Sequence, residues 1–142
     1  MPSSGEQIAV IGDGGWGTAL ALSLDSAGHS VTVWSPFPEY LRDLQTHREN
    51  RLYLPGIPLP PGLRWTADPA AAVAEASVVV LAVPTQYFRA TVRRFAGRIP
   101  ACARIVSVAK GLDSETLDRM SRVAEIELHR ESVAALSGPS LA

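Results

Sequence analysis

In Ile8-Ala9-Val10-Ile11-Gly12-Asp13-Gly14-Gly15-Trp16-Gly17, four consecutive apolar residues run directly into the pattern G-x-G-x-x-G. The apolar run is continuous rather than alternating, which indicates a strand buried on both faces. The residues from Thr18 to Ala27 are rich in Ala and Leu and predict a helix, which Gly28-His29 ends. A buried strand, a glycine loop and a helix in this order are typical of the first unit of an α/β fold.

The remainder of the chain continues the alternation of strands and helices. Apolar runs predict further strands at 31–34, 63–66, 78–83, 104–108 and 133–136, and helical patterns occur at 39–48, 86–95 and 114–129. In the last of these helices Leu117, Met120, Ala124 and Leu128 form one apolar stripe. Asp68-Pro69 predicts the start of another helix, because Asp is a capping residue and Pro suits the first turn. These patterns predict one domain over residues 1–142, an α/β Rossmann-type fold with a doubly wound, mostly parallel sheet and helices on both faces.

The segment 55–62, Pro-Gly-Ile-Pro-Leu-Pro-Pro-Gly, interrupts this alternation. Proline has no backbone N–H and fixes its φ angle, so regular structure is not expected there. The segment is predicted to be an irregular surface loop or lid within the domain.

Composition excludes several classes of function. Thirteen Lys and Arg residues balance fourteen Asp and Glu residues, so no excess charge indicates a nucleic-acid or membrane partner. No apolar run reaches the ~18–20 residues that a bilayer crossing needs, and residues 1–6 lack the features of a secretory signal. Cys102 is the only cysteine, and the three histidines lack metal-ligand spacing. We therefore expect a cytoplasmic protein that binds no metal.

Each glycine of the loop has a separate expected role. Gly12 permits the tight turn, Gly14 lets the backbone approach a pyrophosphate, and Gly17 lets the helix pack closely on the strand. The free N–H groups at the helix start then face the phosphates, and the helix dipole adds about 0.3–1 kcal/mol per exposed charge. The alternative is a glycine-rich turn without a ligand, but the position in the first unit of an alternating chain favours a bound dinucleotide.

The choice between NAD and NADP depends on the end of the second strand. An NAD site usually has an acid about 20 residues after the loop, which holds the ribose 2′-OH. Here the sequence is Trp34-Ser35-Pro36-Phe37, which contains neither an acid nor an arginine. We therefore expect no fixed carboxylate there, and NADPH to be tolerated at least as well as NADH.

Other residues with chemical potential follow predicted strands and should meet at one edge of the sheet. Lys110 directly follows a strand and could place a cation against a phosphate or an oxyanion, or it could be a solvated surface lysine. Ser140 could equally be a turn residue. Trp16 and Phe88 could flank a nicotinamide or a pyrophosphate, or belong to the core. Tyr87 has no identifiable partner as a proton donor.

Taken together, these residues resemble the amino-terminal cofactor domain of NAD(P)-dependent glycerol-3-phosphate dehydrogenase. The resemblance depends on several segments in the expected order. These are Val10 to Ala21, His47-Arg48-Glu49-Asn50, Tyr53-Leu54-Pro55-Gly56, Ala82-Val83-Pro84-Thr85-Gln86, Ala109-Lys110-Gly111-Leu112 and Leu136 to Ala142.

The resemblance implies an oxidoreductase that interconverts sn-glycerol 3-phosphate and dihydroxyacetone phosphate with NAD or NADP, for phospholipid synthesis. It implies a homodimer for the whole enzyme and site residues carried over by position. The cofactor-binding residues would be Gly12, Gly14, Gly15, Trp16, Gly17, Pro36, Phe88, Lys110 and Ala142, and the substrate-binding residues would be Lys110, Gly138 and Ser140.

Two departures from the family pattern affect the nucleotide site. Asp13 replaces a small residue inside the loop and brings negative charge near the phosphates unless its side chain turns away. Pro36 replaces a basic residue that often receives the 2′-phosphate.

The family also continues into a helical substrate domain, which carries the general acid/base. The 142 residues are therefore expected to bind the cofactor without appreciable turnover. Two other functions fit the loop. One is a non-catalytic NAD(P)-binding or redox-sensing module, and the other is a two-domain dehydrogenase of hydroxy acids. A methyltransferase fits less well, because Gly17 favours a dinucleotide.

Overall fold

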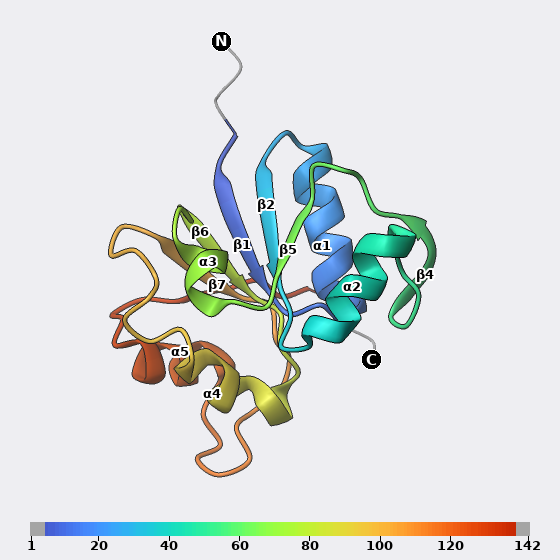
Figure 1. Ribbon diagram of the computed structural model, residues 1–142. Helices are drawn as coiled ribbons and strands as arrows, with labels where there is room; N and C mark the ends of the chain where they lie inside the picture. Colours follow the sequence, from blue (N-terminus) through green and yellow to red (C-terminus); the bar gives the residue numbers. More distant parts are fainter. Residues whose placement is uncertain (1–4, 139–142) are drawn as a thin grey trace.

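The computed structural model describes residues 5–138, in which strands and helices alternate along the chain (Figure 1). The strands are β1 (Gln7–Ile11), β2 (Ser30–Trp34), β3 (Glu49–Asn50), β4 (Leu54–Pro58), β5 (Arg64–Thr66), β6 (Val78–Leu81), β7 (Arg104–Ser107) and β8 (Ala134–Ala135). The helices are α1 (Gly15–Ser26), α2 (Pro38–His47), α3 (Pro69–Val73), α4 (Thr85–Arg93) and α5 (Met120–Leu128).

One parallel sheet organises the molecule, with strand order β5-β2-β1-β6-β7-β8. The chain moves outward from β1 to β2 and β5, and then returns to the other side of β1 at β6. This reversal leaves a crevice at the carboxyl end of β1, which is where ligands bind in open α/β sheets. The predicted Rossmann-type, doubly wound architecture is confirmed.

The central strand is buried on both faces, as its continuous apolar run predicts. Ile8 and Val10 face the layer formed by α1 and α2, where they pack with Ala21 of α1. Ala9 and Ile11 face the layer formed by α3, α4 and α5. Figure 1 shows these two helical layers on opposite sides of the sheet.

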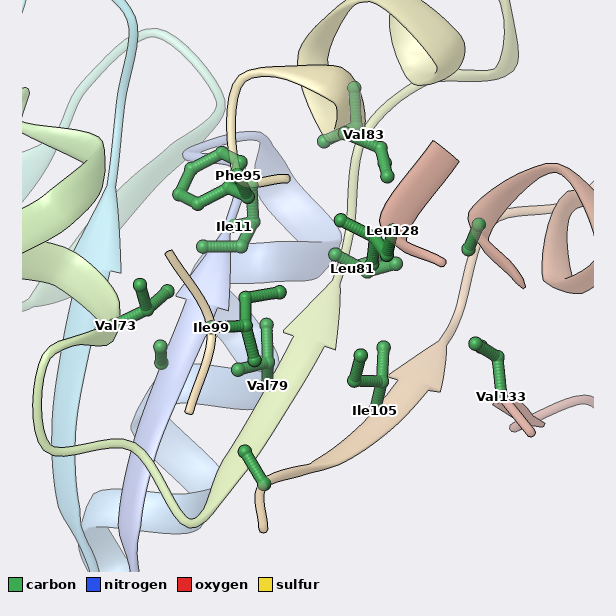
Figure 2. Close-up of a cluster of buried hydrophobic side chains, with 14 of the residues drawn as sticks. Ile11, Val73, Val79, Leu81, Val83, Phe95, Ile99, Ile105, Leu128 and Val133 are labelled. Carbon is green, nitrogen blue, oxygen red and sulfur yellow. The ribbon is translucent and has the colours of Figure 1, made fainter. Parts of the chain in front are cut away.

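The larger hydrophobic cluster lies between the sheet and the layer of α3, α4 and α5 (Figure 2). In Figure 2, strand residues such as Ile11, Val79 and Leu81 meet side chains that come from the covering segments, including Phe95 and Leu128. Because the core lies beneath the strands along their length, their carboxyl ends are held at fixed positions relative to one another.

The prediction that residues 55–62 are wholly irregular is wrong, because β4 covers Leu54–Pro58 and pairs with β3 in a separate antiparallel ladder. Prolines fit here because both strands of this two-stranded ladder are edge strands, and an outward-facing position needs no N–H for a ladder hydrogen bond. The Gly56 N–H donates to the Glu49 carboxylate at 2.7 Å instead of continuing the ladder. The predicted surface position is confirmed for residues 55–58, which are exposed, whereas Leu59 is buried in the core.

The prediction of a helix from Ser114 is also wrong, because α5 begins at Met120. Asp113 accepts hydrogen bonds from the N–H and the hydroxyl of Thr116, both at 3.0 Å, and these bonds favour a turn over a helix. Leu117 has a φ of 60° and is 71% exposed, so it leaves the predicted apolar stripe. Met120, Ala124 and Leu128 are buried as predicted.

None of the helices within 5–138 is both long and apolar enough to span a membrane. In the same part of the chain, no group of three or more His, Cys, Asp or Glu side chains could hold a metal ion.

Candidate dinucleotide-binding site

The turn from β1 into α1 is too tight for side chains at three of its glycines. At Gly15 a Cβ would lie 2.8 Å from the carbonyl oxygen of Tyr53. A Cβ at Gly12, whose φ is 124°, would lie 2.4 Å from the carbonyl oxygen of Ala82. A Cβ at Gly17 would lie 2.4 Å from the carbonyl oxygen of Gly12. Because these glycines have no Cβ, α1 can pack closely against β1 and the residue that follows β6, as the sequence predicts for the first and third glycines.

Gly14 is different, because a Cβ there would meet no protein atom within 4 Å. Its backbone is extended, with a φ of −66°, and it caps α1 without any side-chain hydrogen bond to the first turn. The first N–H groups of a helix have no partner within the helix. The loop therefore presents backbone donors to an open space beside a glycine, which is the arrangement that an anion needs.

Two hollows of about 420 Å³ each meet at Gly14. One lies on the β2 side, and its lining includes the exposed aromatic side chains of Phe37, Tyr53 and Tyr87. The other lies on the β7 side and is lined by Gly15, Trp16, Gly17 and Lys110, among others. Residues 82–84 line both hollows. The two hollows share these residues at the carboxyl ends of β1 and β6, and together they are called the groove below.

A third hollow of about 460 Å³ lies at the opposite edge of the sheet. Its lining includes Gln7 and Arg64, which begin β1 and β5. Because ligands of open α/β sheets bind outside the carboxyl ends of the strands, this hollow is not the candidate site.

The carboxylate of Asp13 turns away from the helix start. It is 8% exposed, and its Oδ2 accepts a 2.7 Å hydrogen bond from the hydroxyl of Ser35, the residue directly after β2. The expectation that no fixed carboxylate lies at the end of β2 is therefore wrong. The sequence shows no acid at positions 34–37, but the fold brings one from the loop.

Asn50 on β3 holds the loop from the other side. It is fully buried, and its Nδ2 donates at 2.8 Å both to the carbonyl oxygen of Asp13 and to the hydroxyl of Thr18. Its Oδ1 accepts from the Tyr53 N–H at 3.0 Å and from the Tyr40 hydroxyl. The antiparallel ladder of β3 and β4 is thus connected directly to the glycine loop, and all four hydrogen-bonding positions of this amide are used.

Lys110 lies at the end of the segment that follows β7, with its side chain exposed at the groove. The hydroxyl of Thr85, the first residue of α4, donates to the Lys110 carbonyl oxygen. Gly111 has a φ of 117°, which is strained for other residues, and a Cβ there would lie 3.0 Å from the Thr85 hydroxyl. The backbone of Lys110 is therefore fixed, while its ammonium group can reach into the groove.

An ion-pair network anchors the loop after Lys110. Arg89 of α4 pairs with Asp113 at 3.1 Å and with Glu127 of α5 at 2.6 Å, and Arg93 pairs with Glu127 at 2.8 Å. The hydrogen bond from Arg89 lowers the pKa of Asp113 to about 2. The pKa of Glu127 is also lowered, mainly by its hydrogen bond with Arg93. Both carboxylates are thus charged at neutral pH and tie the loop to two helices.

Most of the predicted site residues come together in the groove. Gly12, Gly14 and Pro36 line the β2 side, and Gly14, Gly15, Trp16, Gly17 and Lys110 line the β7 side. Phe88 does not join them, because it is fully buried in the larger hydrophobic cluster. Gly138 lines neither hollow. Ser140 and Ala142 lie outside the described residues.

Sequence reasoning missed three residues that support the groove: Asn50, Ser35 and Thr85. Each acts through a hydrogen bond to a residue more than 20 positions away. No local sequence pattern predicts a hydrogen bond between residues so far apart in the chain. For Asn50, its place three residues before the Tyr-Leu-Pro-Gly segment is a usable signal, because both occur in the matched segments.

Known proteins have sequences and structures similar to this chain. The family model for the N-terminus of NAD-dependent glycerol-3-phosphate dehydrogenase matches residues 7–142. A protein of Mycobacterium leprae named glycerol-3-phosphate dehydrogenase (NAD(P)+) is 47% identical over 140 residues, which are 95% of this chain and 40% of that protein. A protein of Mycobacterium tuberculosis with the same activity in its name is 44% identical over 144 residues, covering 100% of this chain and 43% of that protein.

The solved structures agree. The crystal structure of glycerol-3-phosphate dehydrogenase from Coxiella burnetii is similar to this chain with a TM-score of 0.87 and 34% identity, over 96% of this chain and 42% of that one. The chain thus spans less than half the length of these relatives.

Proposed function

Because the chain belongs to the family defined by the N-terminus of NAD-dependent glycerol-3-phosphate dehydrogenase, we propose that it is the nucleotide-binding part of such an oxidoreductase. The groove supports this function. It has an open position at Gly14, backbone donors at the start of α1, and one hollow on each side for the two halves of a dinucleotide.

The residues present fit a nicotinamide dinucleotide. Its two linked phosphates would lie against the N–H groups that open α1, over the space that Gly14 leaves free. Its adenosine half would lie on the β2 side, where Phe37, Tyr53 and Tyr87 offer apolar and aromatic surface. Its nicotinamide half would lie on the β7 side, near Trp16 and Lys110. When bound, the cofactor supplies or accepts the hydride.

Within the groove the chain contributes position and charge. Lys110 is the only cationic side chain that lines either hollow in the described part of the chain. An ammonium group there stabilises a substrate phosphate or the oxygen that becomes negative as a carbonyl is reduced. Thr85 and Gly111 fix the backbone from which it extends. Gly138, which follows β8, lines neither hollow, and its place on the substrate side is proposed from the resemblance alone.

We propose the reaction that the resemblance implies, which is the interconversion of sn-glycerol 3-phosphate and dihydroxyacetone phosphate for phospholipid precursors. Reduction of the carbonyl needs a proton donor as well as a hydride, and we expect that donor in the residues that follow this domain in the relatives. A cytoplasmic location and a homodimer belong to the same proposal.

The test joins this chain to the remainder of the Mycobacterium leprae relative, in place of that protein's own matching residues. The chimera should oxidise NADH or NADPH when dihydroxyacetone phosphate is added, measured by the loss of absorbance of the reduced cofactor. Lys110→Ala should lower kcat/KM about 10- to 150-fold, because a hydrogen bond to a charged group contributes about 1.5–3 kcal/mol. A folded chimera that binds nucleotide but shows no such oxidation would contradict the proposed reaction.

A further inference from the structure

We propose that Asp13 selects NADH over NADPH, with a carboxylate that comes from the glycine loop instead of from the end of β2. This inference rests on the proposed function and goes beyond it, because it names the residue that reads the 2′ position of the adenosine ribose. It reverses the expectation, drawn from the sequence of residues 34–37, that NADPH is tolerated at least as well.

The position of the carboxylate is the first observation. Asp13 lines the hollow on the β2 side together with Pro36 and Phe37, which follow β2. In Rossmann-type domains the adenosine ribose lies at the end of the second strand, where an acid usually accepts a hydrogen bond from its 2′-OH. Although Asp13 lies 22 residues before Ser35 in the chain, its Oδ2 is 2.7 Å from the Ser35 hydroxyl. The charge is therefore located where that acid is normally found.

The hydrogen bonds around Ser35 fix the direction of this carboxylate. The Ser35 hydroxyl donates to Asp13 Oδ2 and accepts from the Phe37 N–H at 3.2 Å. The Asp13 backbone is held independently, because its carbonyl oxygen accepts from the Asn50 amide at 2.8 Å and from the Thr18 hydroxyl at 3.2 Å. Asp13 is thus constrained at both its backbone and its side chain.

The second carboxylate oxygen of Asp13 remains available for a further hydrogen bond. Within residues 5–138, Asp13 Oδ1 accepts no hydrogen bond from the protein. This atom is also not fully buried. Among the described residues, the only fully buried side-chain N or O atom without a hydrogen-bond partner is the Ser107 hydroxyl. A carboxylate oxygen can accept a hydrogen bond from the ribose 2′-OH, but it has no proton to donate to a 2′-phosphate.

The residues that line the hollow on the β2 side include no Lys, Arg or His among the described residues. The guanidinium of Arg94 lies over the ring of Trp34, 4.9 Å from its centroid, and does not itself line the hollow. A 2′-phosphate would therefore meet one fixed negative charge and no cationic side chain among the lining residues. The chemistry of the hollow fits the unphosphorylated ribose of NADH.

The experiment measures dissociation constants by calorimetry for NADH and NADPH with the wild-type chain, Asp13→Asn and Glu39→Gln. Glu39 is the matched control, because it is an exposed acid in the first turn of α2 that does not line the hollow. The wild type should bind NADH more tightly. Asp13→Asn should shift the ratio of the two constants toward NADPH by at least about tenfold, since like charges juxtaposed in a binding site are strongly unfavourable. Glu39→Gln should leave the ratio within about twofold, because exposed charges are screened.

The outcomes separate this inference from the proposed function. A wild type that binds neither nucleotide contradicts the proposed function. A wild type that binds NADH but binds NADPH equally well or better overturns the role of Asp13 alone, and this measurement does not depend on the variants. An unchanged ratio in Asp13→Asn, or an equal shift in Glu39→Gln, also overturns it. As a further arm on the wild type, AMP should bind more tightly than adenosine 2′,5′-bisphosphate.

Discussion

At the scale of residues, Asn50 sets the shape of the loop that should receive the phosphates. It is fully buried and bonds the Asp13 carbonyl, the Thr18 hydroxyl and the Tyr53 N–H. Asn50→Ala should lower the free energy of unfolding by about 1–3 kcal/mol, because it leaves buried partners unsatisfied, and should weaken nucleotide binding more than Tyr40→Phe does. Tyr40→Phe is the control, since it removes one bond to Asn50 but none to the loop. Urea unfolding and calorimetry measure both effects. Equal losses of affinity in the two variants would show that Asn50 does not position the loop.

At the scale of elements, the crossing of α1 over β1 should tolerate no side chain at Gly17. A Cβ there would lie 2.4 Å from the Gly12 carbonyl oxygen, so Gly17→Ala should destabilise the fold by about 1–3 kcal/mol in urea unfolding. Gly14→Ala should cost less, at most about 1 kcal/mol, because its Cβ has open space and the loss comes only from the poorer capping by Ala. Similar stabilities for the two variants would contradict the close crossing.

The turn at Asp113 gives a second prediction for an element, on the pH dependence of stability. Its pKa, lowered to about 2 by Arg89, means that the folded state holds the proton less tightly than the unfolded state does. Stability should therefore be complete above the ordinary carboxyl pKa of about 4 and fall as the pH drops from there toward 2. Asp113→Asn should be less stable at pH 7 and should lose less of its remaining stability over that range, as thermal unfolding at several pH values can measure. An equally steep acid loss in Asp113→Asn would assign the effect to other carboxylates.

At the scale of the whole molecule, the layers could be predicted from the sequence, whereas the details of the groove could not. Continuous apolar runs such as 78–83 indicate strands that are buried on both faces. Such burial requires helices on both sides of a parallel sheet. The roles of Gly12 and Gly17 follow from backbone geometry that any such turn imposes. The contact of Asp13 with Ser35 depends on how two distant segments meet, which no local pattern encodes. The late start of α5 was missed for a similar reason, because the turn at Asp113 is held from α4 by Arg89.

The proposed function depends on backbone donors beside Gly14 that bind the two phosphates of a nicotinamide dinucleotide. The most direct measurement is calorimetric titration of NADH into the wild-type chain and into Gly14→Val, whose side chain would occupy the free space without striking the protein at its Cβ. We expect a dissociation constant between about 1 μM and 1 mM for the wild type, the usual range of KM values for enzyme substrates. We expect Gly14→Val to stay folded and to bind at least about tenfold more weakly, a loss of 1.4 kcal/mol or more. No heat of binding to the folded wild type at millimolar NADH, or equal affinity in Gly14→Val, would contradict it.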